Sequence, residues 1–305
     1  MSNRNWSFIN NRLVRQGTIL VDLQFLENCK AELAGMNDNK EGARFKYSES
    51  LVQYAGVVRC LMRLPYRQTQ GLLIGIAKQV PVLQAPCYTQ IQRRFNKLNV
   101  KIQPKKCTEP FCVAVDSTGI SVTQRGEWMR KIHRKGKNDE CKGFLKIHVA
   151  VDVKTKEIVA IEVTRENVGD NTMLKPVLIQ TVENTDRPID KLLADGGYDT
   201  YDNFDMCHDL NIEPVIRIDD NAITTPPPDT YRERRRGEPI RRKHARIQLA
   251  NRNQWKKDTK YGLRWIAESV FSVLKRRHGE NIQAHKYNHM QHEMYFKATL
   301  YNQLL

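Results

Sequence analysis

The 305 residues include 50 Lys and Arg against 34 Asp and Glu, a formal net charge of +16, which favours polyanionic partners because each neutralised phosphate releases condensed counterions. The seven cysteines, an odd number without a Cys-x-x-Cys pair, argue against a disulfide-bonded secreted protein and favour reduced thiols inside a cell. No stretch approaches the ~20 apolar residues that span a bilayer, and no signal-peptide core opens the chain, so we expect a soluble internal protein without a membrane partner.

The first hundred residues are predicted to be helical. Apolar residues recur at helical spacing over 51–62, and two shorter helices are predicted at 67–79 and 88–98. The last of these carries Arg93, Arg94 and Lys97. Two interpretations stay open for this region: a helix-turn-helix that reads DNA, or a small helical bundle with a basic surface.

From about residue 110 the pattern changes to short β-branched runs alternating with helical segments. The predicted order is three strands, a helix, a strand, a helix and a strand. Residues 152–157 are expected to form a hairpin turn between the second and third strands, and Asp170 or Asn171 is expected to cap the first helix. The predicted ranges are 111–115, 145–151, 158–163, 170–182, 191–194, 200–210 and 212–218.

A basic segment covers about 219–257. Between Tyr231 and Lys257 there are eleven Lys or Arg and two acids, a local net charge of 11 − 2 = +9. In isolation such a run is usually solvated or disordered. Because it lies inside the chain, an ordered insertion or a loop that settles on DNA is equally compatible with it.

The segment Tyr261–Lys275 is predicted to be an amphipathic helix. At about 100° per residue, Tyr261, Arg264, Glu268 and Lys275 fall on one stripe roughly 60° wide, and the apolar residues occupy the opposite half. Taken alone, this is the pattern of an ordinary surface helix with an i,i+4 ion pair between Arg264 and Glu268.

Two aspartates change that interpretation. Asp116 and Asp195 each follow a short apolar run, and open α/β sheets build their sites at such strand ends. Asp195 also opens the sequence Asp-Gly-Gly-Tyr-Asp199, whose glycines allow the backbone to approach a ligand. Each aspartate alone is more often a turn residue, but together with Glu268 on a late helix they predict an acidic active site.

These residues carry a resemblance to a known family. The intervals of Tyr261, Arg264, Glu268 and Lys275 resemble the Tyr-Arg-Glu-Lys signature of insertion-sequence transposases with a ribonuclease-H-like DDE domain. The segments Val113-Ala-Val-Asp116-Ser-Thr-Gly119 and Ala194-Asp195-Gly-Gly-Tyr-Asp199 are similar to the two aspartate motifs of that family. Flanking similarity extends the resemblance over about 45–300, including Leu64-Pro-Tyr-Arg-Gln68, Gly126-Glu-Trp128 and Lys146-Ile-His148.

The resemblance implies a fold and a division of the chain. The implied fold is α/β: a ribonuclease-H-like mixed five-stranded sheet flanked by helices, in which the first and fourth strands are neighbours, with an α-helical N-terminal domain. Residues 1–105 are expected to bind DNA or dimerise. Residues 106–305 are expected to form the catalytic domain, with the basic insertion at about 219–257.

The resemblance also implies a chemistry. Asp116, Asp195 and Glu268 are expected to be catalytic and to bind two Mg²⁺ or Mn²⁺ ions, hard cations that prefer carboxylate oxygens. Arg264 and Lys275 are expected to grip phosphates beside the scissile bond, and Tyr261 to bind a phosphate or stack near a base.

Trp128 and Trp265 are candidates for stacking on a flipped base, although both are more often core residues. His148 is interpreted as structural or DNA-adjacent, facing the same way as Lys146.

The implied partners are double-stranded DNA, as transposon ends and target, and a second copy of the chain on DNA. A nucleoid-associated protein of the prokaryotic cytoplasm is expected. Three alternatives remain: an inactive domesticated transposase that only binds DNA, a ribonuclease of the same fold that cuts RNA–DNA hybrids, and a basic structural protein. The first two alternatives keep the implied ribonuclease-H-like fold. The third requires the spacing of the motifs to be a coincidence.

Overall fold

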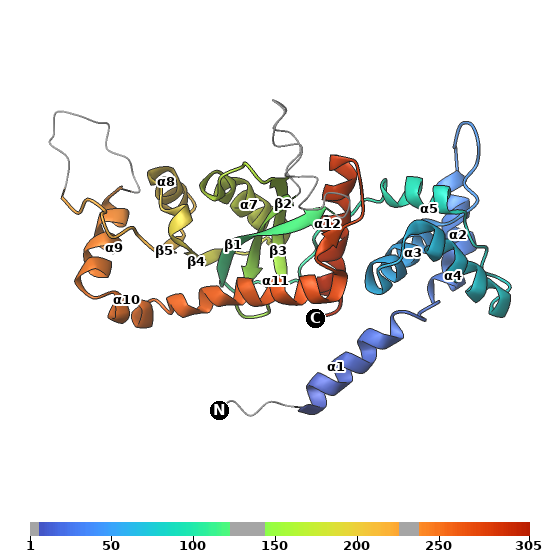
Figure 1. Cartoon of the computed structure of the whole chain (residues 1–305), viewed down its shortest axis with the longest axis horizontal. Coiled ribbons are helices and arrows are strands. Elements are labelled where there is room, and N and C mark those ends of the chain that lie inside the picture. The colour runs from blue at the N-terminus through green and yellow to red at the C-terminus, as the bar shows by residue number, and fades with distance from the viewer. Residues whose placement is uncertain (1–5, 123–143, 226–237) are drawn as a thin grey trace, which may run out of the picture. The chain divides into compact units, whose positions relative to one another are not determined.

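A computed structural model describes residues 6–122, 144–225 and 238–305 of the chain, which fold as a mixed α/β protein (Figure 1). Two compact units are present. The first comprises Met1–Val100, Arg277–Gly279 and Gln283–Leu305, and the second comprises Lys101–Arg276 and Glu280–Ile282. The sequence predicts one boundary, at 105, and in the structure the C-terminal residues Gln283–Leu305 group with the helical first unit.

The first unit is built from helices, as the periodicity predicts. They are α1 (Trp6–Thr18), α2 (Phe25–Asn37), α3 (Glu49–Met62), α4 (Tyr66–Gln79), α5 (Tyr88–Phe95) and α12 (Tyr287–Gln303). Helix α3 begins where the Ser48 hydroxyl accepts a hydrogen bond from the Leu51 amide at 3.2 Å, and it ends at Arg63, whose backbone is left-handed. The core joins α3 and α5 to α12 through Val52, Phe95, Phe296 and Leu300.

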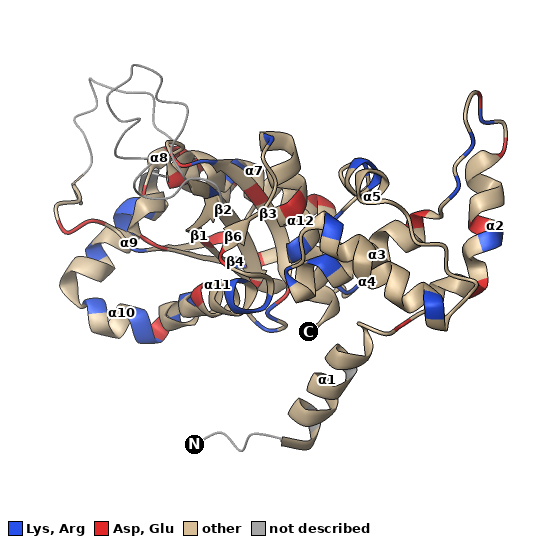
Figure 2. Ribbon diagram, turned by 45° about the vertical axis from the view of Figure 1, so that its right-hand side comes forward, with Lys and Arg blue, Asp and Glu red and all other residues tan. Residues whose placement is uncertain are grey.

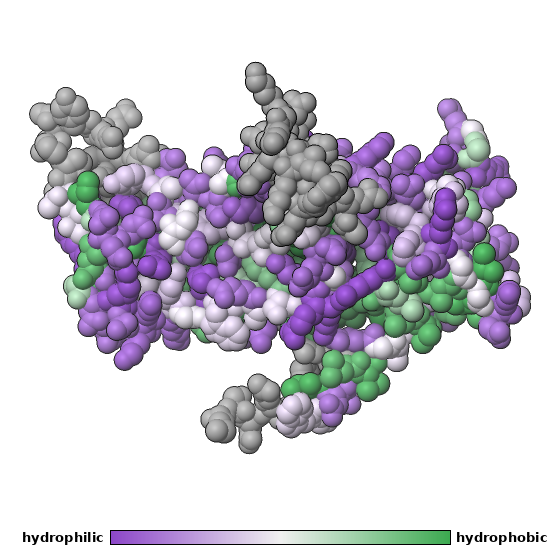
Figure 3. All heavy atoms as spheres, viewed as in Figure 1, coloured by the Kyte–Doolittle hydropathy of each residue, from purple (hydrophilic) through white to green (hydrophobic). Residues whose placement is uncertain are grey.

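Apolar side chains of α1 remain on the surface. Trp6, Leu13 and Val14 are 61%, 51% and 67% exposed, and α1 contributes to the hydrophobic colouring in Figure 3. Exposed apolar groups on one helix are more informative than scattered ones, because they show that this helix is not fully covered by its own unit.

The second unit is a mixed sheet with the strand order β3-β2-β1-β4-β5, and β6 pairs with β1. Strands β1, β2 and β3 are antiparallel neighbours, and β4, β5 and β6 run parallel to the strands they pair with. Their bounds are β1 (Phe111–Val122), β2 (Phe144–Asp152), β3 (Ile158–Arg165), β4 (Ile189–Ala194), β5 (Glu213–Ile216) and β6 (Asn281–Ile282). The five predicted strands and the pairing of the first with the fourth are confirmed. The two-residue β6 is an addition, too short to carry a periodicity.

Helices of the second unit follow the predicted order. They are α7 (Asp170–Thr185), α8 (Tyr201–Asp209), α9 (Glu238–Ala250), α10 (Arg252–Asp258) and α11 (Trp265–His278), with 3₁₀ turns η2 (Gly196–Tyr198) and η3 (Tyr261–Arg264). Leu174 and Val177 of α7 pack in one core with Val113 and Val115 of β1. Because side chains alternate along a strand, Asp116 faces the side of the sheet away from α7.

Two local predictions need correction. Asp116 lies inside β1, which continues to Val122, because the ladder with β2 reaches Ser121↔Phe144 and backbone pairing does not require apolar side chains. Gly169, rather than Asp170 or Asn171, occupies the N-cap of α7, and Asp170 is the first helical residue.

The basic segment is partly an ordered insertion, since α9 and α10 occupy 238–258 and carry several of its cations (Figure 2). Residues 226–237 lie outside the described ranges. Across the described ranges, no helix is both long enough and apolar enough to cross a bilayer.

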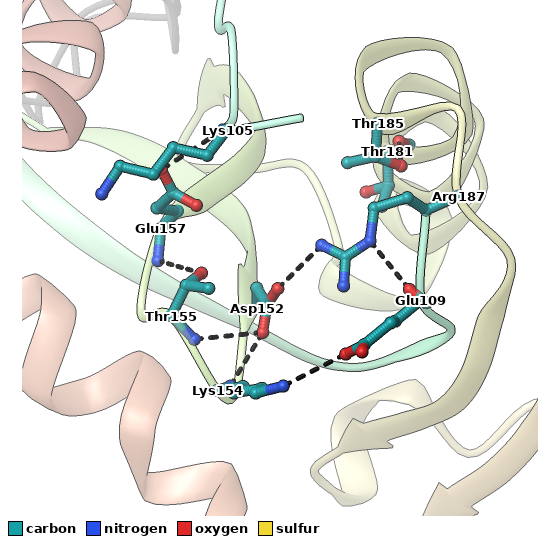
Figure 4. A network of polar contacts seen from close by, with 9 residues as sticks. All are labelled: Lys105, Glu109, Asp152, Lys154, Thr155, Glu157, Thr181, Thr185 and Arg187. Atoms are coloured by element: carbon teal, nitrogen blue, oxygen red, sulfur yellow. Dashed lines mark hydrogen bonds and ion pairs between the residues drawn. The ribbon is translucent and has the colours of Figure 1, made fainter. Parts of the chain in front are cut away.

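A buried ion pair anchors the end of the sheet where β2 turns into β3 (Figure 4). Asp152 accepts hydrogen bonds from the amides of Lys154 and Thr155 at 2.8 and 3.2 Å, which closes the predicted hairpin turn. Its other oxygen accepts from Arg187 at 3.0 Å, and these two side chains are 1% and 5% exposed. The Arg187 side chain also donates to the Glu109 carbonyl at 2.9 Å.

Replacing Asp152 with Ala is expected to destabilise the protein by about 3–5 kcal/mol, because the Arg187 charge would stay buried without its partner. Urea unfolding followed by circular dichroism measures the change. Glu109→Gln is the matched control: it removes an ion pair with Lys154 whose side chains are 70% and 82% exposed, and such pairs contribute little. Equal stability of the Asp152→Ala protein and the control would contradict the assignment.

Candidate active site

Asp116 lies in the middle of the sheet, next to β4. Its Oδ1 accepts a hydrogen bond from the Ser117 amide at 2.8 Å, and its Oδ2 accepts from Arg264 Nη1 at 3.0 Å. Strand β4 pairs in parallel with β1 up to Ala114↔Leu193. Asp195, which directly follows β4, therefore emerges at the level of Asp116.

Asp195 is oriented by the turn that it begins. Its Oδ1 accepts a hydrogen bond from the Gly197 amide at 2.9 Å and caps η2. A Cβ on Gly197 would lie 3.1 Å from that same oxygen, tighter than ordinary contact. The second glycine of Asp-Gly-Gly thus lets the backbone approach the carboxylate closely, which gives the motif a local structural reason.

Glu268 approaches from the first turn of α11. Arg264 Nη2 donates to its Oε1 at 2.6 Å, so one guanidinium binds Glu268 and Asp116 together. The sequence predicted the i,i+4 pair between Arg264 and Glu268. It did not predict that the same arginine reaches Asp116, because the 148 positions that separate the two residues give no local signal.

The electrostatics agree with a concentration of negative charge. Burial raises the pKa of Asp116. The neighbouring carboxylates of Asp195 and Glu268 raise this pKa further, whereas the hydrogen bond from the Ser117 amide and the charge of Arg264 oppose the shift. Burial likewise raises the pKa of Tyr261, with Asp195 adding to the shift and Arg264 opposing it. Asp195 and Glu268 therefore both lie close enough to Asp116 to shift its pKa.

Lys275 and Tyr261 occupy different surroundings from one another. Lys275 Nζ donates to Thr118 Oγ1 at 2.8 Å, on the face of β1 that also carries Asp116. Tyr261 is only 9% exposed and packs on Trp255 with ring centroids 4.9 Å apart. The prediction of one continuous helix from Tyr261 to Lys275 is wrong, because Tyr261–Arg264 form the 3₁₀ turn η3 and α11 begins at Trp265. Tyr261 therefore packs in the interior, and a contact with DNA stays a prediction.

Trp265 lies on the surface beside this site. It is 55% exposed, which excludes the core role that tryptophan most often has. Trp128, the other stacking candidate, lies outside the described residues.

A second polar cluster lies on the α7 face of the sheet. The buried His148 shares a hydrogen bond with Thr164 at 3.0 Å, and Asp170 contacts both His148 at 3.4 Å and Lys146 at 2.8 Å. Burial lowers the pKa of His148 to about 4, with Asp170 opposing the shift and Lys146 adding to it. Lys146 and His148 do face the same way, as expected.

One residue near the acids, Tyr198, is absent from the predicted site. The Tyr198 hydroxyl is buried and has no hydrogen-bond partner among the described residues. Burial raises its pKa, and Asp170, Asp116 and Asp195 add to that shift. Its signal in the sequence is its place in the Asp-Gly-Gly-Tyr motif.

The carboxylates supply the donor type that hard divalent cations prefer. Within the described ranges, however, no three His, Cys, Asp or Glu side chains gather as a metal-binding group. Arg264 instead links Asp116 to Glu268. Carboxylate oxygens are ligands that suit Mg²⁺. In this structure the positions of Asp116 and Glu268 are those of carboxylates bound to Arg264.

Comparison with known families decides the classification. Residues 109–303 match a family described as a transposase DDE domain, and this match spans more than half of the chain and includes Asp116, Asp195 and Glu268. The chain belongs to the DDE transposase family. A second family with the same description matches residues 14–125, so similarity to DDE transposases also covers most of the helical first unit. The family implies DNA as the partner of this transposase and typically uses divalent metal ions.

Proposed function

We propose that this DDE transposase binds the terminal inverted repeats of an insertion sequence and catalyses metal-dependent DNA cleavage and strand transfer at Asp116, Asp195 and Glu268. The observation that carries the proposal is the Arg264 guanidinium, which links an acid on β1 to an acid on α11, beside the strand end that presents Asp195. An acidic site that also influences neighbouring pKa values is a typical catalytic arrangement. Membership of the group with the Tyr-Arg-Glu-Lys signature is part of the proposal.

The chemistry requires a nucleophile and relief of charge on the leaving oxygen. Two Mg²⁺ or Mn²⁺ ions, held by Asp116, Asp195 and Glu268, would supply both. Water attacks phosphorus at the transposon end, the phosphodiester P–O bond breaks, and a 3′-hydroxyl is freed. In strand transfer this hydroxyl attacks a target phosphodiester, forming one P–O bond as another breaks. No nucleotide cofactor is needed, since one ester replaces another.

DNA would be held by cationic side chains and by the exposed ring of Trp265. Arg264 and Lys275 lie along the face of β1 that carries Asp116, where a guanidinium and an ammonium can bind phosphate oxygens. Helices α9 and α10 add further cations (Figure 2). Joining two ends to one target requires two active sites, so we propose a homodimer on DNA, acting at the nucleoid of a prokaryotic cell.

The deciding experiment uses a supercoiled plasmid that carries the DNA flanking the gene on both sides. With Mg²⁺, the wild-type protein is expected to nick or excise at the inverted repeats and to leave an RNA–DNA hybrid intact. Cleavage of the hybrid alone would favour a ribonuclease. Binding of the ends by both wild type and Asp195→Ala without any cleavage would favour an inactive DNA-binding protein.

Trp265→Ala is expected to weaken binding to end-derived DNA by about tenfold, since base–aromatic stacking contributes roughly 1–3 kcal/mol per base. Fluorescence anisotropy measures the affinity. The melting temperature should stay unchanged, because Trp265 is already more than half exposed. Unaltered DNA affinity would remove Trp265 from the proposed interface.

A further inference from the structure

Arg264 is held by two of the three acids. Its Nη1 donates to Asp116 Oδ2 at 3.0 Å and its Nη2 donates to Glu268 Oε1 at 2.6 Å. The arginine side chain is 22% exposed, so the pair of contacts is partly shielded from water. Because a guanidinium presents donors in a rigid plane, it can hold two carboxylates at once. The oxygens that it occupies are among those that a divalent ion would use.

Lys275 provides a natural comparison, because it is the second cation of the same predicted stripe. Its ammonium donates to the neutral hydroxyl of Thr118, at 2.8 Å, two residues beyond Asp116 on β1. Both cationic side chains therefore contact residues of β1, and both are among the residues proposed to bind phosphate. They differ in their acceptors: Arg264 binds two carboxylates, and Lys275 binds a hydroxyl.

We infer that Arg264 takes the place of a metal cation between Asp116 and Glu268 while DNA is absent, and that a DNA phosphate draws it away, so that DNA and metal strengthen each other's binding. The inference rests on the proposed function. Like charges in one site repel, and a bound guanidinium relieves that repulsion before any metal arrives. Phosphate oxygens compete for the same donors, because they also bind arginine in a bidentate manner.

Reciprocity makes the inference quantitative. If DNA raises the metal affinity by some factor, the metal must raise the DNA affinity by the same factor. A protein without the arginine should bind metal more tightly when DNA is absent and should gain less from DNA. Arg264→Lys keeps the positive charge, but its ammonium lacks the planar donors that bind both carboxylates. Its metal affinity without DNA should therefore lie between that of wild type and that of the protein without the arginine.

The first experiment titrates DNA-free protein with Mn²⁺ by calorimetry. Arg264→Gln is expected to bind Mn²⁺ about tenfold more tightly than wild type (about 1.4 kcal/mol), because metal binding to wild type must first break the charge-assisted hydrogen bonds between Arg264 and the two carboxylates. Lys275→Gln removes one positive charge from the same stripe without releasing a carboxylate, and it should match wild type. Melting temperatures establish that each variant is folded, and Arg264→Lys replaces the glutamine variant if the latter is not.

The second experiment adds a short duplex of mixed sequence at low salt and subtracts the Mn²⁺ that the duplex binds alone. The duplex should raise the Mn²⁺ affinity of wild type and of Lys275→Gln by a factor about tenfold larger than the factor for Arg264→Gln. This difference is the coupling that is lost with the arginine. Lys275→Gln should show this gain despite binding the duplex more weakly.

The outcomes separate the inference from the function on which it rests. If wild type binds Mn²⁺ and Asp195→Asn does not, but Arg264→Gln binds it no more tightly than wild type, the inference is overturned and the metal site stands. If wild type and Asp195→Asn bind Mn²⁺ equally, the proposed metal-dependent function itself fails. A tenfold gain in Lys275→Gln as well would show a general charge effect and would also overturn the inference.

Discussion

Asp195→Asn is expected to reduce DNA cleavage by about a thousandfold or more, because metal ions supply several kcal/mol of transition-state stabilisation and each 1.36 kcal/mol is tenfold in rate. The amide oxygen of Asn can still accept the hydrogen bond that Gly197 donates to Asp195. The turn should therefore persist while one anionic ligand is lost. Single-turnover cleavage of end-carrying DNA in Mg²⁺ measures the effect.

Binding must be measured alongside cleavage. DNA affinity in the absence of metal should equal that of wild type or exceed it slightly, since removing an anion near phosphate lowers repulsion. Asp190→Asn is the matched control: it removes an exposed carboxylate from the same strand, β4, and should cleave normally. Normal cleavage by Asp195→Asn would exclude this residue from the active site and end the proposal for the three acids.

Glu293→Ala is expected to destabilise the first unit by about 3–5 kcal/mol, since it would leave buried charges without their partner. Glu293 is 2% exposed and accepts from Arg59 at 3.3 Å and from Lys297 at 3.0 Å, and these two side chains are 2% and 4% exposed. It also accepts from the amides of Gln283 and Ala284 at 3.2 and 3.1 Å. Urea unfolding at pH 7 measures the loss, and Glu27→Gln, at an exposed position on α2, serves as the control.

The same residue predicts a pH dependence. Burial acts to raise the pKa of Glu293, but Lys297 and Arg59 outweigh it, so the pKa of the folded protein lies below the ordinary value of 4.5. A carboxyl with a depressed pKa stabilises the fold above its unfolded pKa, and this contribution is lost as the pH falls through the folded pKa. Wild type should therefore lose stability below about pH 4.5, and the difference between wild type and Glu293→Ala should shrink there. A difference that stays constant down to acid pH would contradict the assignment.

The sequence by itself determined the kinds of element and their order. Hydrophobic periodicity is a local property, so the runs at 111–115, 145–151 and 158–163 were sufficient to predict three strands, and 170–182 a helix. The spacing of the motifs was also sufficient to suggest the family to which the chain belongs. Where a boundary depended on backbone pairing rather than side-chain type, as at Asp116 inside β1, the prediction fell short.

Only the tertiary structure decided which distant residues meet. The double contact of Arg264, the pairing of β6 with β1 and the membership of α12 in the first unit all join positions that are far apart in the chain. Tyr261 shows the same limit at short range, because residues 261–264 form a 3₁₀ turn before α11 and the Tyr261 ring packs on Trp255. Periodicity records which face of an element is apolar. The partner of that face, and the acceptor of each cation, follow from packing and hydrogen-bond geometry that exist only once the chain has folded.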